Sequence, residues 1–147
     1  MSDFRQLSPA MFASPQIQPA QLSEAKELGV SLVINNRPDG EAPDEPQGPE
    51  IEAAAREAGM DYLAIPISQS GFSEPQVAAM QEAVEKTDGA ILAYCRSGTR
   101  STFLWSLAQA RAGQNPDELA QAAMGAGYDV SPVRPAMDML FGQAKAD

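Results

Sequence analysis

The chain has 147 residues and carries ten Lys and Arg against twenty Asp and Glu, which gives a net charge of −10 and an isoelectric point near 4.3. Such an acidic surface disfavours nucleic acid and anionic membranes as partners, because both are bound by cations that neutralise phosphate. The absence of histidine excludes histidine-based triads, dyads and zinc sites, and a single cysteine excludes an internal disulfide or a CxxC redox pair.

The N-terminus and the hydropathy pattern predict a cytoplasmic protein. The first residues contain no basic region followed by an apolar run, so they do not resemble a signal peptide. No apolar stretch approaches the ~20 residues needed to cross a bilayer. The length is that of one domain, and we expect residues 1–147 to form a single domain without metal or cofactor.

The first third of the chain predicts two short strands, a helix and a third strand. Residues 4–7 and 11–13 are predicted as edge strands because prolines interrupt them. Residues 19–28 place leucine and alanine on one helical face and are followed by glycine, a typical helix end. The apolar run at 31–35 is typical of a strand that is buried on both faces.

The middle of the chain predicts a loop and two further helix–strand pairs. Segment 37–48 is rich in proline, glycine and acidic residues and is predicted to be a solvated loop. A helix over 49–58 precedes a second buried strand over 62–65. A helix over about 73–86, opened by a capping box, precedes a third buried strand over 90–94.

The last third of the chain is predicted to be helical. One helix covers 100–112, another begins after Asn115, and an amphipathic helix follows Ser131 and Pro132. Strands that alternate with helices indicate a parallel sheet with helices on both of its faces. We therefore expect an α/β fold of three layers, αβα, around a short and mainly parallel sheet.

The cysteine lies directly after the third buried strand, in the segment Tyr94-Cys95-Arg96-Ser97-Gly98-Thr99-Arg100-Ser101. Sites of open α/β sheets lie beyond the carboxyl ends of the strands. A lone cysteine is by itself typical of a small buried apolar residue. Between Asp88 and Asp117, however, the chain has three arginines and no acid. A buried strand and an apolar helix explain most of that gap, but not the two arginines that follow Cys95, which indicate an anion site.

The residue types of this segment suit both an anion and a nucleophilic thiolate. Gly98 allows a tight turn, so that backbone amides and a helix N-terminus point at one centre. The same surroundings favour a Cys95 thiolate without any histidine. Arg100 can donate two hydrogen bonds to an oxyanion, and the Ser101 hydroxyl can donate to the thiolate or to a leaving sulfur. The other expected residues of the anion-binding loop are Arg96, which we expect to point outward, Ser97 and Thr99.

The segment resembles the active-site loop of rhodanese-like sulfurtransferases, in which four residues separate cysteine and arginine. Together with Leu-Val-Ile-Asn-Asn-Arg-Pro-Asp-Gly-Glu at 32–41 and Tyr-Leu-Ala-Ile-Pro at 62–66, it is similar to a bacterial family. That family is the phosphatase-like domain of beta-lactamase hydrolase-like proteins, and the resemblance covers roughly residues 2–112. It implies a fold similar to the dual-specificity phosphatases, with the cysteine loop after a central strand.

Two features separate the chain from the phosphatases of that fold. Those enzymes place five residues between cysteine and arginine, whereas four intervene here. A loop shorter by one residue forms a narrower ring of amides, which we expect to fit a single sulfur atom better than a phosphoryl group. They also place an aspartate after the Ile-Pro of the preceding strand, where this chain has none. A general acid contributes about 10²–10⁴-fold to such a reaction. The residues of segment 37–48 that could supply it, or form the rim of the site, are Asp39, Glu41, Asp44 and Arg37.

The sequence therefore favours a cysteine-dependent sulfurtransferase. The Cys95 thiolate would take sulfur from a small anionic donor, become a persulfide and pass the sulfur to a thiol acceptor. The first alternative is a cysteine-dependent phosphatase that hydrolyses a phosphorylated substrate through a phosphocysteine intermediate. The second alternative is a non-catalytic module that binds an anion or a partner through the loop.

Overall fold

A computed structural model describes residues 2–68 and 71–146 of the protein. The strands are β1 (Arg5–Ser8), β2 (Met11–Ser14), β3 (Val30–Asn35), β4 (Asp61–Ala64) and β5 (Ala90–Tyr94). The α-helices are α1 (Leu22–Glu27), α2 (Gly48–Glu57), α3 (Glu74–Lys86), α4 (Thr99–Arg111), α5 (Pro116–Gly125) and α6 (Arg134–Ala146). Two short 3-10 helices are η1 (Pro19–Gln21) and η2 (Ser131–Val133).

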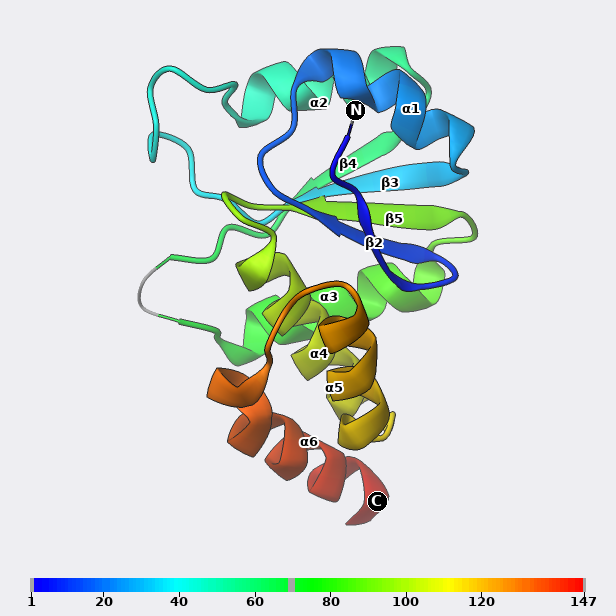
Figure 1. Ribbon diagram of the computed structural model, residues 1–147, viewed down its shortest axis with the longest axis vertical. Coiled ribbons are helices and arrows are strands. Elements are labelled where there is room, and N and C mark those ends of the chain that lie inside the picture. The colour runs from blue at the N-terminus through cyan, green and yellow to red at the C-terminus, as the bar shows by residue number, and fades with distance from the viewer. Residues whose placement is uncertain (1, 69–70, 147) are drawn as a thin grey trace.

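The strands form a five-stranded sheet in the order β1-β2-β5-β3-β4. Only the β1–β2 pair is antiparallel among the pairings of the described residues, and β2, β5, β3 and β4 are parallel. Helices α1 and α2 cover one face of the sheet, and α3 to α6 lie on the other (Figure 1). The expected three-layer α/β fold with a mainly parallel sheet is confirmed.

The register brings four strand ends to one edge of the sheet. Tyr94, the last residue of β5, is level with Ser14 on one side and Asn35 on the other, and Asn35 is level with Ala64. The segments that follow β2, β3, β4 and β5 therefore begin side by side. Because β5 is central, Cys95 emerges in the middle of this edge.

Helix α4, which follows Cys95 in the chain, is held in place by packing against three other helices. It packs against α3, α5 and α6, and both Leu104 and Trp105 are buried. Burying large apolar side chains of this kind stabilises the fold by about 1.5–3 kcal/mol each. This packing fixes the N-terminus of α4, which begins five residues after the end of β5.

Two strand expectations are wrong. β2 is an interior strand between β1 and β5, not an edge strand, and its four residues are all buried. The strand predicted over 62–65 is β4, an edge strand whose side chains are mostly exposed. A short apolar run does not distinguish these cases, because the order of strands in a sheet is set by tertiary contacts. No helix in residues 2–68 and 71–146 is long and apolar enough to cross a membrane.

Candidate active site

Backbone hydrogen bonds join the strand ends around Cys95. The Cys95 N–H donates to the Ser14 carbonyl at 3.3 Å, and the Asn36 N–H donates to the Tyr94 carbonyl at 2.8 Å. On the far side of the loop, the Gln16 N–H donates to the Arg96 carbonyl at 3.2 Å. The candidate site thus lies at the carboxyl ends of parallel strands, where the sequence placed it.

Residues 95–101, which we name the thiol loop, place a backbone amide on the Cys95 sulfur. The Gly98 N–H donates to the Cys95 Sγ at 3.1 Å, one residue before α4 begins. Gly98 has a φ of +89°, in the left-handed region that glycine favours. Helix α4 begins at the next residue, so the positive end of its dipole lies close to the sulfur. Cys95 is fully buried in this arrangement.

Tyr128, in the segment after α5, braces the thiol loop from outside. Its hydroxyl donates to the Ser97 carbonyl at 3.1 Å. A Cβ at Gly98 would overlap the Tyr128 hydroxyl oxygen, so Gly98 is required by close approach as well as by its φ. The Arg5 guanidinium lies 5.1 Å from the centre of the Tyr128 ring. The sequence analysis missed Tyr128, because no local motif ties it to the thiol loop.

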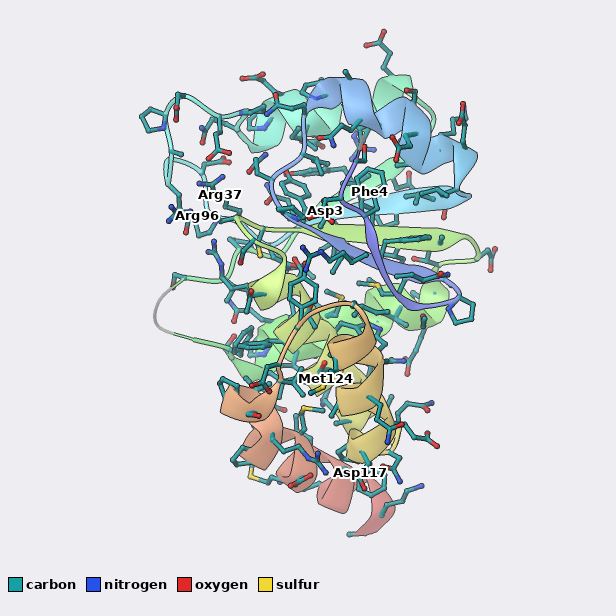
Figure 2. All side chains as sticks on the ribbon, in the orientation of Figure 1. Asp3, Phe4, Arg37, Arg96, Asp117 and Met124 are labelled. Carbon is teal, nitrogen blue, oxygen red and sulfur yellow. The ribbon has the colours of Figure 1, made fainter. Side chains whose placement is uncertain are left out.

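The remaining side chains of the thiol loop divide into buried and exposed ones. The Ser97 hydroxyl donates to the Thr99 hydroxyl at 2.9 Å at the surface. The Ser101 hydroxyl is completely buried and has no hydrogen-bond partner among the described residues. Arg96, which we expected to point outward, is exposed at the edge of the sheet where the strands end (Figure 2).

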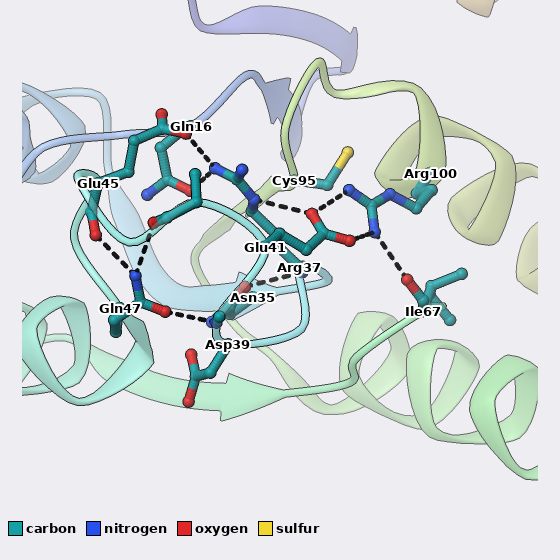
Figure 3. Close-up of polar contacts among 12 residues, drawn as sticks. Gln16, Asn35, Arg37, Asp39, Glu41, Glu45, Gln47, Ile67, Cys95 and Arg100 are labelled. Carbon is teal, nitrogen blue, oxygen red and sulfur yellow. Dashed lines mark hydrogen bonds and ion pairs between the residues drawn. The ribbon is translucent and has the colours of Figure 1, made fainter. Parts of the chain in front are cut away.

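Arg100 is paired with a carboxylate from segment 37–48, which we name the acid loop. Its Nη1 and Nη2 donate to the two carboxylate oxygens of Glu41 at 2.8 and 2.9 Å. Nη1 also donates to the Ile67 carbonyl at 2.8 Å (Figure 3). The segments after β3, β4 and β5 therefore meet on one guanidinium, and Figure 3 shows Cys95 beside it.

Arg37 is the second cation of this cluster. Its Nε donates to Glu41 at 2.8 Å, and its Nη1 donates to Gln16 and Glu45, each at 2.8 Å. The Arg37 side chain is only 7% exposed. The expectation of a simply solvated loop is therefore wrong at Arg37 and Glu41, because these charges pair with one another and with Arg100.

The other two candidate acids do not join the arginine pairs among the described contacts. The Asp39 carboxylate accepts the N–H of Gly48 at 2.8 Å, at the start of α2. This contact satisfies a free amide at a helix N-terminus. Asp44 is exposed. Of the three acids named from the sequence, Glu41 is the one that the fold brings to Arg100.

The charges of this cluster shift one another's proton affinities. The hydrogen bonds from Arg100 hold the pKa of Glu41 below its usual range, with a further contribution from Arg37, against the opposing effect of burial. The pKa of Arg100 is raised, mainly by Glu41 and also by the Cys95 sulfur. Burial disfavours the charge of Arg37, but Glu45 and Glu41 outweigh it and raise the pKa. Glu41 is thus a carboxylate held between two guanidinium groups.

Known proteins match most of the chain. The family described as "Beta-lactamase hydrolase-like protein, phosphatase-like domain" matches residues 3–112. A beta-lactamase hydrolase-like protein of Xylella fastidiosa is 36% identical over 103 residues, which are 69% of this chain and 24% of that protein. One from Agrobacterium fabrum is 38% identical over 86 residues, 58% of this chain and 20% of that protein. The chain thus spans about a quarter or less of the length of these curated relatives.

Solved structures match nearly the whole chain. A candidate phosphatase from Neisseria meningitidis Z2491 has a TM-score of 0.83 and 27% identity, over 95% of this chain and 99% of that one. A candidate phosphatase from Shewanella putrefaciens CN-32 has a TM-score of 0.74 and 26% identity, over 99% and 90%. A candidate dual-specificity phosphatase from mouse, at 20% identity and a TM-score of 0.70 over 99% and 91%, shares the fold.

These matches decide the family and the fold, and they favour one of the two activities. The Neisseria and Shewanella structures are named for phosphatases, the family is named for a phosphatase-like domain, and none of these names mentions sulfur transfer. The comparisons therefore support the phosphatase alternative better than the sulfurtransferase that the loop spacing favoured. The chain belongs to the family of the phosphatase-like domain of beta-lactamase hydrolase-like proteins, and it has a fold like that of the dual-specificity phosphatases.

Proposed function

We propose that the protein is a cysteine-dependent phosphatase that hydrolyses phosphate monoesters through a phosphocysteine at Cys95. One observation carries the proposal: the Cys95 sulfur lies at the N-terminus of α4, accepts the Gly98 amide and has the Arg100 guanidinium beside it. This arrangement offers a nucleophile and donors for phosphoryl oxygens at one point. The family and its structural relatives support the same reaction class.

The reaction has two displacement steps at phosphorus. The Cys95 thiolate attacks, the S–P bond forms, and the P–O bond to the leaving group breaks with its electron pair on oxygen, which takes up a proton. Water then attacks the phosphocysteine and loses a proton. The S–P bond breaks, the electron pair returns to sulfur as the thiolate, and phosphate leaves.

Three groups of the thiol loop have assigned roles in this proposal. The amides before and within the first turn of α4 bind phosphoryl oxygens, and Arg100 donates two hydrogen bonds to them. The Ser101 hydroxyl, buried and without a partner among the described residues, donates to the Cys95 sulfur when sulfur is the leaving atom. Such a donor lowers the cost of regenerating the thiolate in a buried site.

A second candidate, sulfur transfer, rests on the loop length. Four residues separate Cys95 from Arg100, one fewer than in the phosphatases that the sequence resembles. A persulfide places one sulfur atom in the amide ring, whereas a phosphocysteine places phosphorus and three oxygens there. The phosphorylated substrate therefore requires a wider ring than the persulfide does.

Parallel assays on one preparation test the proposal. We expect wild type to release phosphate from an aryl phosphate and to carry one phosphoryl group on Cys95 after an acid quench. Cys95→Ser should abolish both signals, while its thermal unfolding shows that it is folded. Thiosulfate with a thiol acceptor supplies the second arm. A persulfide on Cys95 without phosphate release would overturn the phosphatase, and neither product would indicate the non-catalytic module.

A further inference from the structure

The two donors that Arg100 would offer to a phosphoryl group are used within the protein. Arg100 Nη1 and Nη2 donate hydrogen bonds to the two carboxylate oxygens of Glu41, at 2.8 and 2.9 Å. Two parallel N–H···O bonds are also how a guanidinium binds phosphate. Glu41 thus holds the position on Arg100 that the proposed substrate needs.

The burial of Cys95 adds a second constraint. Its sulfur has no exposed surface, so no substrate reaches it until neighbouring groups move. Arg100 is poorly placed to move, because it belongs to the first turn of the packed helix α4 and also donates to the Ile67 carbonyl. Glu41 lies on a loop rich in proline and glycine and retains 32% side-chain exposure. Glu41 is therefore the partner that exchanges.

The displaced carboxylate stays near the reacting group. Arg37 holds Glu41 through its own Nε at 2.8 Å and is itself anchored to Gln16 and Glu45. When the Arg100 contacts break, this second contact keeps the Glu41 side chain at the rim of the thiol loop. A rim position is where the leaving-group oxygen of a monoester bound to Cys95 would lie.

We propose that Glu41 is the general acid of the phosphatase reaction and that the substrate brings it into use by displacing it from Arg100. The inference rests on the proposed function. The phosphate dianion takes over the Arg100 hydrogen bonds, and Glu41 takes up one proton from solvent. It gives this proton to the leaving oxygen as the P–O bond breaks, and the resulting carboxylate accepts the proton of the water that hydrolyses the phosphocysteine.

The electrostatics agree with this order of events. In the free protein, Arg100 and Arg37 hold the pKa of Glu41 low, which suits an ion pair and not an acid. The charged groups around Glu41 are these two arginines, with Glu45 across Arg37 and Cys95 beyond Arg100. A dianion bound to Arg100 ends the direct contact that lowers the pKa of Glu41 most and adds a negative neighbour. Both changes favour the protonated carboxyl, and only the contact with Arg37 still opposes it.

The test compares two substrates that differ in their need for an acid. A good leaving group, as in p-nitrophenyl phosphate, departs without a proton, whereas phenyl phosphate has a much more basic leaving oxygen. We expect Glu41→Gln to lower kcat/KM about 100-fold on phenyl phosphate and less than tenfold on p-nitrophenyl phosphate, because kcat/KM reports the displacement of the leaving group and not the later hydrolysis of phosphocysteine, which both esters share. Asp44→Asn is the matched control, because it makes the same charge change in the acid loop, and we expect both rates within about twofold of wild type.

Binding of tungstate, followed by calorimetry, tests the displacement separately from catalysis. Glutamine keeps the shape of Glu41 but competes for Arg100 without a charge. We expect tungstate to bind Glu41→Gln about five- to tenfold more tightly than wild type, and Asp44→Asn like wild type. Tungstate binding also shows that each variant is folded at the site.

The outcomes distinguish this inference from the proposed function. If wild type neither hydrolyses the two esters nor binds tungstate, the phosphatase fails and the acid role fails with it. If wild type is active but Glu41→Gln loses equally on both esters and binds tungstate more weakly, Glu41 positions Arg100 and is not the acid. Unchanged rates in Glu41→Gln also overturn the acid role, and unchanged tungstate affinity overturns the displacement.

Discussion

The thiol loop and the acid loop meet at Arg100, yet they are held in different ways. In the thiol loop the position of the sulfur is set by backbone, through the Gly98 amide, its left-handed φ and the start of α4. In the acid loop the position of Glu41 is set by side-chain contacts to Arg37 and Arg100. Backbone geometry costs much to change, whereas partly exposed ion pairs exchange with other anions. The site thus combines a fixed nucleophile with an exchangeable carboxylate.

If the backbone fixes the thiol loop, Gly98→Ala should have the largest effect of the variants considered. The new Cβ would overlap the Tyr128 hydroxyl oxygen, and the alanine would have to adopt a positive φ. We expect a loss of about 3 kcal/mol in the free energy of unfolding, measured by chemical denaturation. Gly113→Ala is the control, since Gly113 has φ +97° and no atom within 4 Å of its Cβ position; it should cost about 1–2 kcal/mol.

A double variant separates strain from overlap at the same position. Tyr128→Phe removes the nearest atom, so Gly98→Ala should cost less in that background than in wild type. Equal costs in the two backgrounds would show that the contact with Tyr128 does not constrain the thiol loop.

Arg100→Lys tests the residue at which the two loops meet, because Arg100 belongs to the thiol loop and binds Glu41 of the acid loop. Lysine keeps the charge but loses the two parallel donors, so we expect kcat/KM on an aryl phosphate to fall about 100-fold, or about 2.7 kcal/mol. Arg96→Ala changes the exposed arginine of the same loop and should cost less. A greater loss in Arg96→Ala would reverse the roles assigned to the two arginines.

Tyr128→Phe alone should have a smaller effect. It removes the hydrogen bond to the Ser97 carbonyl and leaves the ring in place, so we expect a loss of about 1 kcal/mol or less in the free energy of unfolding. Hydrogen exchange at the amides of Gly98 and Thr99 should become faster. Tyr62→Phe, which removes a hydroxyl bonded to Asn35 instead, should leave those two amides unchanged.

The smallest effect concerns the acid loop and pH. The pKa of Glu41 is lowered in the folded protein, so its pairs stabilise the fold at pH values above its ordinary pKa of 4.5. That stability is lost as the pH falls through the lower, folded value. We expect wild type to be about 0.5 kcal/mol more stable than Glu41→Gln at pH 7, and the difference to disappear on acidification. A constant difference between pH 7 and pH 3 would contradict the pairing.

The sequence predicted the elements of the fold better than their order. Apolar runs and following glycines are local signals, so the strands at 31–35 and 90–94 and the helix over 100–112 lie within about two residues of β3, β5 and α4. The interior position of β2 and the edge position of β4 depend on which strands pair, which no local pattern shows. The α/β class followed from the alternation alone.

The candidate site was predicted in the same uneven way. Cys95 and Arg100 follow from a contiguous motif on a strand–helix junction, and the structure places both there. Glu41 was one of three acids that the sequence left open, because its contact with Arg100 joins segments far apart in the chain. Tyr128 and the Ile67 carbonyl carried no sequence signal. Loop spacing favoured sulfur transfer, whereas the comparisons favour phosphoryl transfer.

The contact between Tyr128 and the thiol loop shows that the segment matched by the family is shorter than the domain that folds around Cys95. The family similarity ends at residue 112, but the thiol loop is contacted by a side chain beyond that point. Helices α5 and α6 also cover α4, whose N-terminus faces the sulfur. The solved structures that resemble the chain cover 95% and 99% of it, so their likeness is not confined to residues 3–112. The domain that must fold around Cys95 is therefore longer than the segment that the family description matches.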